Sequence, residues 1–404
     1  MYITRHIENK IIAMQKMFKV LLVTGPRQVG KTTTLKHLFK DTYNYVTLDD
    51  INQLNLAKTD AKLFFKANQL PLIIDEVQYA PELFTEIKRI VDQTSMYGQI
   101  ILTGAQAYHL MEGVSESLAG RVGIIEFSGL SLREINDETY SKSMIPDDEY
   151  LKINRKKITN NLWETIFKGD MPEVYSNSEI DVDLFYSSYV RTYIERDARA
   201  IINLKNLDTF SKFIIVLAAR TAQVLNYSQI ADEVGTDQKT IKSWIKILES
   251  SGIITIIKPF SNNALKRVIS SPVLYFNDTG LVVHLLQWPT AKTLQNGAFS
   301  GQILETYAVS QIVKSYKNNG YLKLPLSFYR DHDFKEIDLI IEFGDILYPI
   351  EIKKTMVPNY SMIKNFDVLN KALGFKIGTK TILCLVDDKL PLGKDAIAYP
   401  ISEI

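Results

Sequence analysis

The stretch Gly25-Pro26-Arg27-Gln28-Val29-Gly30-Lys31-Thr32 fills the pattern GxxxxGK followed by Ser or Thr, and it directly follows an apolar run from Val20 to Val23. A strand, a glycine-rich loop and a helix in this order are typical of a phosphate-binding loop. Its glycines let backbone N–H groups wrap the phosphate, and the next helix turns its positive N-terminus toward the anion. We expect the stretch and the adjacent Thr33 to contact ATP, with Lys31 neutralising the β- and γ-phosphate oxygens and Thr32 offering its hydroxyl to Mg²⁺.

Two carboxylates end a later apolar run, Leu72-Ile73-Ile74-Asp75-Glu76. Such a run predicts a strand buried on both faces, and its C-terminal end is the edge where a parallel α/β sheet presents its ligands. We expect Asp75 to hold Mg²⁺ and Glu76 to polarise the attacking water. A hydrolase needs that glutamate, whereas a small-molecule kinase uses the hydroxyl of its substrate, so the pair favours hydrolysis over a kinase reaction.

Two more residues are candidates for catalysis. Thr103 follows the apolar strand of residues 99–102 at the same sheet edge, where it could sense the γ-phosphate or orient the water, although capping the strand is an almost equally good explanation. Arg121 follows a loop and could supply positive charge to the transition state, either in its own site or across a subunit interface. Action across an interface would require a homo-oligomer.

The composition bounds the class of protein. The 404 residues leave room for two or three domains, and 46% hydrophobic content is ordinary for a globular chain. No run approaches the length of a membrane span and the start lacks a signal-peptide core, so we expect a cytoplasmic protein with no membrane contact. With 47 basic and 46 acidic residues, any DNA contact must be local. The one cysteine, Cys384, excludes an intramolecular disulfide and lies in an apolar run, so we expect it inside a strand.

The fold class predicted from these patterns is α/β, with four segments. Residues 1–128 alternate apolar strands with amphipathic helices, which predicts a P-loop AAA-like ATPase domain with helices on both faces of a parallel sheet. Residues 129–205 turn to helical periodicity and are expected to form a helical lid or connector. The strands of the first segment are expected at residues 20–24, 44–48, 71–75, 99–103 and 122–127.

Residues 206–290 are predicted to form a winged helix-turn-helix. Residues 227–248 read as two short helices around a turn at Gly235, and the apolar runs 253–257 and 273–276 could make the β-wing. DNA binding is one interpretation, and a winged helix used only for protein contacts is the other. The side chains expected on the exposed face of the second helix are Gln238, Lys239, Lys242 and Lys246.

Residues 291–404 are predicted to form an α/β domain with a restriction-endonuclease-like core. Asp338, Glu351 and Lys353 fit the D…ExK layout of metal-dependent nucleases, and Glu351 and Lys353 share one strand face because they are two residues apart. Asp338 and Glu351 could chelate Mg²⁺, with Glu305 from a helix completing the metal shell and Lys353 activating water. An acidic strand pair on a folded surface is the simpler alternative.

Together these features resemble a large prokaryotic family of AAA-like ATPases, in which an AAA_14 ATPase domain is joined to a C-terminal DUF4143 region. The resemblance covers essentially the whole chain, and it implies ATP binding and hydrolysis, a winged-helix module and a restriction-endonuclease-like core. Besides the phosphate loop, it rests on Ile74-Asp75-Glu76-Val77-Gln78 with Pro81-Glu82-Leu83-Phe84, Leu102-Thr103-Gly104, Leu118-Ala119-Gly120-Arg121-Val122, Tyr193-Ile194-Glu195-Arg196-Asp197, Ser271-Pro272 with Asp278-Thr279-Gly280-Leu281, and Glu336-Ile337-Asp338 with Glu351-Ile352-Lys353.

The chain departs from the family pattern at two places. Ala105 stands where members usually carry a serine, which weakens the case for a polar sensor just beyond Thr103. Gly169-Asp170 replaces a Gly-Gly pair and puts a carboxylate where bare backbone is expected. The sequence therefore favours an ATPase whose nucleotide state controls DNA engagement. The alternative is a nucleotide-dependent switch that binds a protein partner through its C-terminal half and cleaves nothing.

Overall fold

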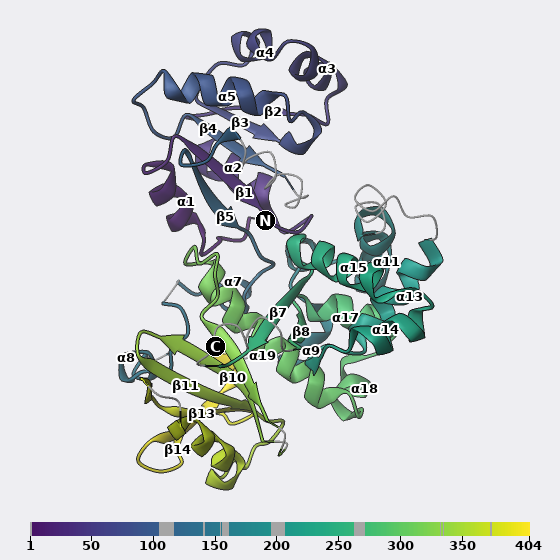
Figure 1. Ribbon diagram of the computed structural model, residues 1–404, viewed down its shortest axis with the longest axis vertical. Helices are drawn as coiled ribbons and strands as arrows, with labels where there is room; N and C mark the ends of the chain where they lie inside the picture. The colour runs from purple at the N-terminus through teal and green to yellow at the C-terminus, as the bar shows by residue number, and fades with distance from the viewer. Residues whose placement is uncertain are drawn as a thin grey trace.

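The computed structural model describes three groups of elements that meet at a central junction (Figure 1). A first sheet with its helices occupies the top of the view, a group of helices lies to the right, and a second sheet lies at the lower left. The residues described are 2–104, 117–139, 142–153, 155, 161–194, 207–261, 271–331, 333, 335–371 and 374–404.

The first sheet is parallel and has the strand order β2-β3-β4-β1-β5, which confirms the predicted parallel α/β architecture of this segment. Its central strands are built from Val, Leu and Ile and are buried throughout, as expected for strands covered on both faces. The strands are β1 (Val20–Thr24), β2 (Asn44–Thr47), β3 (Leu72–Asp75), β4 (Ile100–Thr103) and β5 (Val122–Glu126). The helices are α1 (Glu8–Gln15), α2 (Lys31–Phe39), α3 (Ile51–Thr59), α4 (Ala61–Ala67), α5 (Leu83–Asp92) and the 3-10 turn η1 (Val77–Tyr79).

Short helices connect the first sheet to the rest of the molecule. Several start at a side-chain cap, for example Ser131, whose hydroxyl accepts from the Glu134 N–H while the Glu134 carboxylate accepts from the Ser131 N–H. Arg133 then donates to the carbonyls of Glu403 and Ile404 and ties this segment to the C-terminus. The elements are α7 (Leu132–Ile135), α8 (Asp148–Leu151), α9 (Leu162–Lys168), α10 (Pro172–Ser176), α11 (Val182–Tyr189) and the π-helical turn η2 (Val190–Ile194).

The next segment combines helices with a small antiparallel sheet. Trp244 packs edge-on against Phe210 and Phe213, with ring centroids 5.2 and 5.1 Å apart, and so joins α15 to α13. The strand β8 pairs antiparallel with both β6 and β7. The elements are α13 (Leu207–Ala218), β6 (Gln223–Val224), α14 (Tyr227–Val234), α15 (Gln238–Ser250), β7 (Ile254–Pro259), β8 (Val273–Phe276), α17 (Thr279–Leu285) and α18 (Ala291–Asn296).

The C-terminal sheet continues into that small sheet. The strands β7 and β9 pair in parallel at Lys258 with Ser327 and at Pro259 with Phe328, so one sheet has the path β14-β15-β13-β11-β10-β9-β7-β8-β6. The long helix α19 (Ser300–Lys317) is buried along most of its length. No helix in the described ranges combines the length and apolar character needed to cross a membrane. The remaining elements are β9 (Leu326–Arg330), β10 (Glu336–Phe343), β11 (Ile346–Ile352), η3 (Tyr360–Lys371), β12 (Lys376–Ile377), β13 (Lys380–Cys384), β14 (Leu390–Pro391), β15 (Ala396–Pro400) and η4 (Ile401–Glu403).

Candidate active site

The loop Gly25 to Thr32 runs from the end of β1 into the start of α2. Its glycines are required by geometry: Gly25 has φ of 136° and a Cβ there would lie 2.4 Å from the Phe127 carbonyl oxygen, while Gly30 has φ of 91° immediately before α2. Pro26 and Val29 are buried, whereas Arg27 and Gln28 are partly or fully exposed. The loop is therefore packed on its inner side and accessible on its outer side.

Lys31 and Thr32 begin α2 and are held by the loop and by the sheet edge, respectively. Lys31 Nζ donates to the carbonyls of Gly25 (2.9 Å) and Pro26 (2.7 Å), so the ammonium lies over the loop itself. Thr32 Oγ1 donates to Asp75 Oδ2 at 2.9 Å. The expected neighbourhood of lysine, hydroxyl and carboxylate is present, although Thr32 and Asp75 are 43 positions apart.

Tyr45 is a neighbour of Asp75 that sequence reasoning missed. Its hydroxyl donates to Asp75 Oδ2 at 2.8 Å, and the Lys36 ammonium lies 3.7 Å from the centre of its ring. The strand β2 brings Tyr45 beside β3, and no motif spacing signals this. Burial and the hydrogen bond to Asp75 raise the pKa of the Tyr45 hydroxyl above its ordinary value.

Glu76 stands directly after β3 with φ of 56°, a left-handed conformation that residues with a side chain seldom adopt. Its carboxylate lies 3.6 Å from the Arg27 guanidinium and accepts a hydrogen bond from the Gln78 amide. Burial raises the pKa of this carboxyl, and the lowering effects of Gln78 and Arg27 do not fully offset that rise. A carboxylate of raised basicity beside the phosphate loop suits a general base.

Thr103 ends β4, the strand that lies between β1 and β3. It is fully buried, and its hydroxyl has no hydrogen-bond partner among the described residues. A buried hydroxyl without a partner is costly and is explained when a ligand or water completes it. Ala105, two residues after Thr103, lies outside the described residues.

The residues at the end of the phosphate loop and at the end of β3 are suited to hold a nucleotide with its metal ion. Thr32 and Asp75 place a hydroxyl and a carboxylate side by side, which are the oxygen ligands that Mg²⁺ prefers. The loop precedes the N-terminus of α2, where backbone N–H groups and the helix dipole favour phosphate. Thr33 is exposed at the same helix start.

Arg121 lies at the opposite edge of the sheet. It precedes β5, whereas the phosphate loop follows β1, and the two strands are parallel. The four residue steps of β1 separate the two edges by about 13 Å. Its guanidinium is paired with Asp92 at 2.6 and 3.0 Å. The expectation that Arg121 serves its own site is therefore wrong, and its action across a subunit interface stays a prediction.

In the C-terminal sheet, Asp338 on β10 and Glu351 on β11 lie beside Lys353. Lys353 Nζ is 2.6 Å from Glu351 Oε1 and 3.7 Å from Asp338 Oδ2. Glu305 on α19 accepts a hydrogen bond from Tyr275 OH at 2.8 Å. Burial and the charge of Asp338 raise the pKa of Glu351 to about 8 and the pKa of Glu305 well above its ordinary value.

The ammonium of Lys353 is thus the group between the two strand carboxylates. Within the described ranges, no group of three or more His, Cys, Asp or Glu is arranged to hold a metal ion. The expected metal shell of Glu305, Asp338 and Glu351 is therefore not assembled in this arrangement. Glu351 Oε2 is buried and has no hydrogen-bond partner among the described residues, so one carboxylate oxygen is available to a further ligand.

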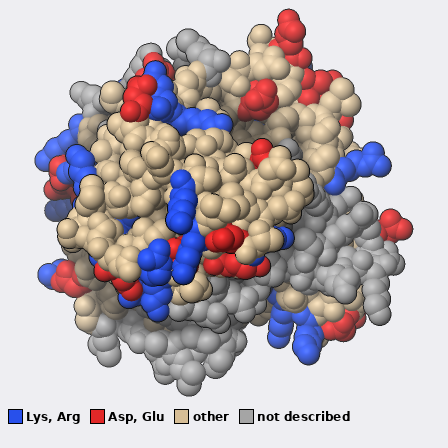
Figure 2. Space-filling model, turned by 90° about the horizontal axis from the view of Figure 1, so that it is seen from above, with Lys and Arg blue, Asp and Glu red and all other residues tan. Residues whose placement is uncertain are grey.

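The second helix of the expected helix-turn-helix, α15, begins after Asp237, whose carboxylate accepts from the Thr240 N–H at 3.0 Å. The candidate contact residues Gln238, Lys239, Lys242 and Lys246 are all exposed. On the face that Figure 2 shows, basic and acidic side chains are interspersed, and the described part of that face carries no continuous basic surface.

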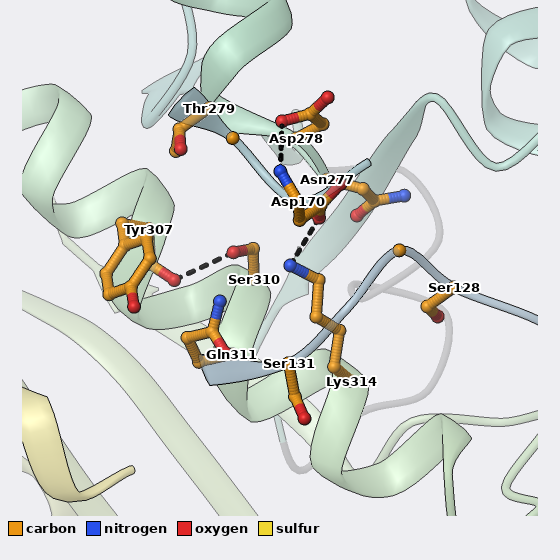
Figure 3. Close-up of polar contacts among 12 residues, drawn as sticks. Ser128, Ser131, Asp170, Asn277, Asp278, Thr279, Tyr307, Ser310, Gln311 and Lys314 are labelled. Carbon is orange, nitrogen blue, oxygen red and sulfur yellow. Dashed lines mark hydrogen bonds and ion pairs between the residues drawn. The ribbon is translucent and has the colours of Figure 1, made fainter. Parts of the chain in front are cut away.

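A buried polar cluster behind the phosphate loop was missed by the sequence analysis (Figure 3). Lys314 on α19 forms an ion pair with Asp170, and the Asp170 N–H donates to Asp278 Oδ1 at 3.2 Å. These three residues line the same small cavity as Pro26 and Val29 of the loop. The departure at Asp170 was the only signal in the sequence, because its partners lie more than a hundred positions away.

Comparison with known families finds three matching regions. Residues 17–136 match an AAA domain family (AAA_14), residues 159–292 match a domain of unknown function (DUF8612), and residues 300–404 match DUF4143, also described as a domain of unknown function.

Among curated proteins, the chain is 26% identical over 387 residues to the uncharacterized protein Rv2008c of Mycobacterium tuberculosis, and the match covers 95% of this chain and 80% of the relative. The uncharacterized protein Mb2031c of Mycobacterium bovis matches to the same extent. Among solved structures, a Walker-type ATPase of Pyrococcus abyssi is 15% identical with a TM-score of 0.38, over 70% of this chain and 96% of that one. A RuvB variant of Thermotoga maritima is 16% identical with a TM-score of 0.27, over 65% and 91%.

Proposed function

Since this chain carries an ATPase domain of the AAA_14 type joined to a DUF4143 domain, we propose that it hydrolyses ATP with Mg²⁺ and that its nucleotide state controls how the C-terminal half engages nucleic acid. The observation that carries the hydrolysis is the meeting of Lys31, Thr32, Asp75 and Glu76 at one sheet edge, where Thr32 Oγ1 and Asp75 Oδ2 are 2.9 Å apart.

Each residue of the site has a separate task in this reaction. When ATP binds, Lys31 exchanges the carbonyls of Gly25 and Pro26 for phosphate oxygens, because its ammonium already lies over the loop. Thr32 and Asp75 would hold Mg²⁺, which supplies positive charge to the β- and γ-phosphates. Glu76 accepts the proton of the attacking water. The hydroxyl of Thr103, which has no hydrogen-bond partner among the described residues, binds the γ-phosphate or that water.

The test of hydrolysis compares wild type with Lys31→Ala and with Lys40→Ala, which removes an exposed lysine at the end of the same helix. Phosphate release is measured with Mg²⁺ and again with EDTA. We expect turnover in wild type and Lys40→Ala, none in Lys31→Ala, and none with EDTA. Wild-type turnover from Lys31→Ala would refute the site.

The nucleic-acid part of the proposal rests on α14 and α15, which we interpret with β7 and β8 as a winged helix-turn-helix. The exposed lysines of α15 would contact phosphates, and Gln238 near the helix start would reach base edges. The double variant Lys239→Glu with Lys242→Glu should weaken DNA binding and reduce the slope of log affinity against log salt by about 2. The matched control is Lys58→Glu with Lys62→Glu on α3 and α4, and equal effects of the two pairs would argue against α15.

The DUF4143 region is proposed to be a restriction-endonuclease-like domain in which Asp338, Glu351 and Lys353 form the reactive group. A metal shell completed by Glu305 would require this side chain to leave the hydroxyl of Tyr275. The proposal predicts cleavage of linear or circular DNA with Mg²⁺ or Mn²⁺ that Lys353→Ala abolishes. Cleavage that also requires Lys31 would show that ATP gates it.

A second candidate function is a nucleotide-dependent switch that binds a protein partner and cleaves nothing. It is favoured by the direct contacts of Lys353 with both strand carboxylates and by the bond that engages Glu305 with Tyr275. Its signature would be ATP turnover that DNA does not change, together with no phosphodiesterase activity under any metal.

Arg121 is proposed to act in trans, which requires a homo-oligomer. Sedimentation with ATP should then show an assembly, and mixing Arg121→Ala with Lys31→Ala protomers should restore part of the turnover that each variant lacks alone. Unchanged turnover in Arg121→Ala would remove the residue from the reaction.

A further inference from the structure

Arg5 is a buried arginine that precedes α1 and contacts the phosphate loop from behind. Its side chain is only 2% exposed. The guanidinium donates to the Val29 carbonyl through Nη1 at 2.6 Å, and to the carbonyls of Ser128 (2.8 Å) and Gly129 (3.1 Å) through Nη2. Its Nε donates to Glu134 at 3.1 Å. The planar fork therefore joins the loop, the segment after β5 and the start of α7 in one network.

The contact with Val29 concerns the orientation of a peptide group that binds phosphate. Because a peptide is planar and trans, its C=O and N–H point in opposite directions. The carbonyl of Val29 and the N–H of Gly30 belong to the same peptide, so a carbonyl held toward Arg5 turns the Gly30 N–H to the other side, which is the side of the phosphate. In the same loop, Lys31 covers the carbonyls of Gly25 and Pro26.

We infer that Arg5 is a positioning residue for nucleotide binding. It presets the phosphate loop by holding the Val29 carbonyl away from the phosphate, while Glu134 fixes the guanidinium of Arg5. This inference rests on the proposed binding of ATP. Lys31 must leave its loop carbonyls when a phosphate arrives, whereas Arg5 is engaged by Glu134 and three carbonyls and keeps these contacts. Arg5 therefore lowers the cost of ordering the loop and takes no part in the chemical step.

Glu134 is fixed as firmly as Arg5. It accepts from the backbone N–H groups of His6 and Ser131, both at 2.7 Å, and from the Ser131 hydroxyl at 3.0 Å. Burial alone would raise its pKa, but the charge of Arg5 and these donors outweigh burial and hold the pKa below its ordinary value.

The network extends to the C-terminal domain. The Leu132 N–H, one residue along the same helix start, donates to Gln311 Oε1 on α19 at 2.8 Å. Figure 3 shows Ser128, Ser131 and Gln311 on neighbouring segments of this junction. The partners of Arg5 are thereby joined to the helix that also carries Glu305.

The experiment compares Arg5→Lys with Arg133→Lys. Both arginines are buried and donate to backbone carbonyls, but the bonds of Arg133 go to Glu403, Ile404 and Tyr150, which lie outside the loop. Lysine keeps the positive charge but lacks the planar guanidinium with its several N–H donors, so Arg5→Lys cannot bond to all the partners of Arg5 at once. We expect Mg-ATP to bind about ten- to hundredfold more weakly to Arg5→Lys, the range for one lost charge-assisted hydrogen bond.

Steady-state kinetics separate positioning from catalysis. In Arg5→Lys, KM should rise by the same factor as the dissociation constant while kcat at saturation stays within about twofold of wild type, as for loss of uniform binding. Arg133→Lys should lower the melting temperature and leave nucleotide affinity unchanged. Wild-type affinity in a folded Arg5→Lys, or an equal loss in both variants, would overturn the inference.

Two further results distinguish other outcomes. If wild type binds no ATP, the proposed function fails before the inference is reached. If Arg5→Lys does not fold, Glu134→Gln decides: it keeps the shape of the side chain and removes the charge that fixes the guanidinium. Weaker Mg-ATP binding in a folded Glu134→Gln supports the inference, and unchanged binding refutes it.

Discussion

Glu76 is held beside the phosphate loop in a left-handed conformation, with Arg27 and Gln78 on its carboxylate. Glutamine at this position keeps the size of the side chain and cannot accept the proton of water. We therefore predict that Glu76→Gln binds Mg-ATP as wild type does and turns it over at least about a hundredfold more slowly, the usual contribution of a general base. The exposed Glu82, six residues along, provides the control variant Glu82→Gln. Turnover close to wild type in Glu76→Gln would transfer the role of base to another residue.

Asp278 predicts a dependence of stability on pH. Burial and the neighbouring Asp170 raise its pKa to about 8 in the folded protein, against an ordinary value of about 3.9 in the unfolded chain. The stability that the protonated form contributes is fully present below about pH 4 and is lost as the pH rises through the folded pKa near 8.

The variant Asp278→Asn has no proton to lose, and its amide oxygen can still accept from the N–H groups of Gly280 and Asp170. Its melting temperature should therefore fall less than that of wild type between pH 6 and pH 9, as measured by thermal unfolding. The exposed Glu179→Gln serves as the control. Equal pH dependence in wild type and Asp278→Asn would show that Asp278 stays ionised throughout this range.

At the scale of residues, the sequence predicts what depends on short spacing. The contacts of Lys31 and Thr32 with their neighbours follow from one loop and one strand end, and Cys384 is buried in β13 as expected. The role of Arg5 could not be predicted, because its partners Val29 and Glu134 lie 24 and 129 positions away. Contacts of this kind depend on which segments the fold brings together.

The turn between α15 and β7 contacts the phosphate loop directly. Gly252 has φ of 72°, and a Cβ at this position would lie 2.9 Å from Cδ of Pro26 in the loop. Its carbonyl accepts from the Asn277 amide at 2.8 Å, which fixes the turn against the end of β8. The C-terminal end of α15 and the phosphate loop therefore cannot move independently at this contact.

Replacing this glycine tests that link between the two elements. Gly252→Ala combines the left-handed strain of about 1–2 kcal/mol with a clash against Pro26. Gly235→Ala, at the end of α14, has φ of 84° and no atom within 4 Å of the new Cβ, so it carries the strain alone. Both variants should melt earlier in thermal unfolding, and only Gly252→Ala should weaken Mg-ATP binding. Equal affinities in the two variants would show that the loop tolerates displacement of the turn.

Elements are predicted well where periodicity and burial agree. The two helices around Gly235 are found as expected, and Ile230, Ile241 and Trp244 are buried in them. The cap of α14 is Asn226, which accepts from the Gln229 N–H, while Ser228 lies inside the helix and donates to Asn226. Neighbouring side chains that can all cap leave the exact start of a helix open.

The pairing of β7 with β9 was not predictable from the sequence. Only two residue pairs join these strands, Lys258 with Ser327 and Pro259 with Phe328. The composition of a segment indicates that it forms a strand but does not identify the strand with which it pairs. Here the partner strand lies about 70 residues away along the chain. The consequence is one sheet that passes from the candidate DNA-binding segment into the DUF4143 domain.

At the scale of the whole molecule, three segments come together at the phosphate loop and the cavity behind it. Arg5 reaches it from the N-terminus, Gly252 from the end of α15, and Lys314 of α19 lines the same cavity behind Pro26. A change of loop conformation on ATP binding would therefore act on the segments packed around the loop, which lead to α15 and to the helix that carries Glu305. Under the proposed function, this junction is where the nucleotide state acts on the C-terminal half.

The most direct test of this control is the affinity for a labelled DNA duplex in different nucleotide states, measured by fluorescence anisotropy at fixed salt. Glu76→Gln should keep ATP bound because its turnover is expected to be at least about a hundredfold slower, and Lys31→Ala serves as the variant that cannot respond. We predict that the dissociation constant of Glu76→Gln for DNA differs by about tenfold or more between ATP and ADP, a coupling of about 1.4 kcal/mol, and that Lys31→Ala shows no difference. The same dissociation constant with ATP, with ADP and without nucleotide in Glu76→Gln would contradict it.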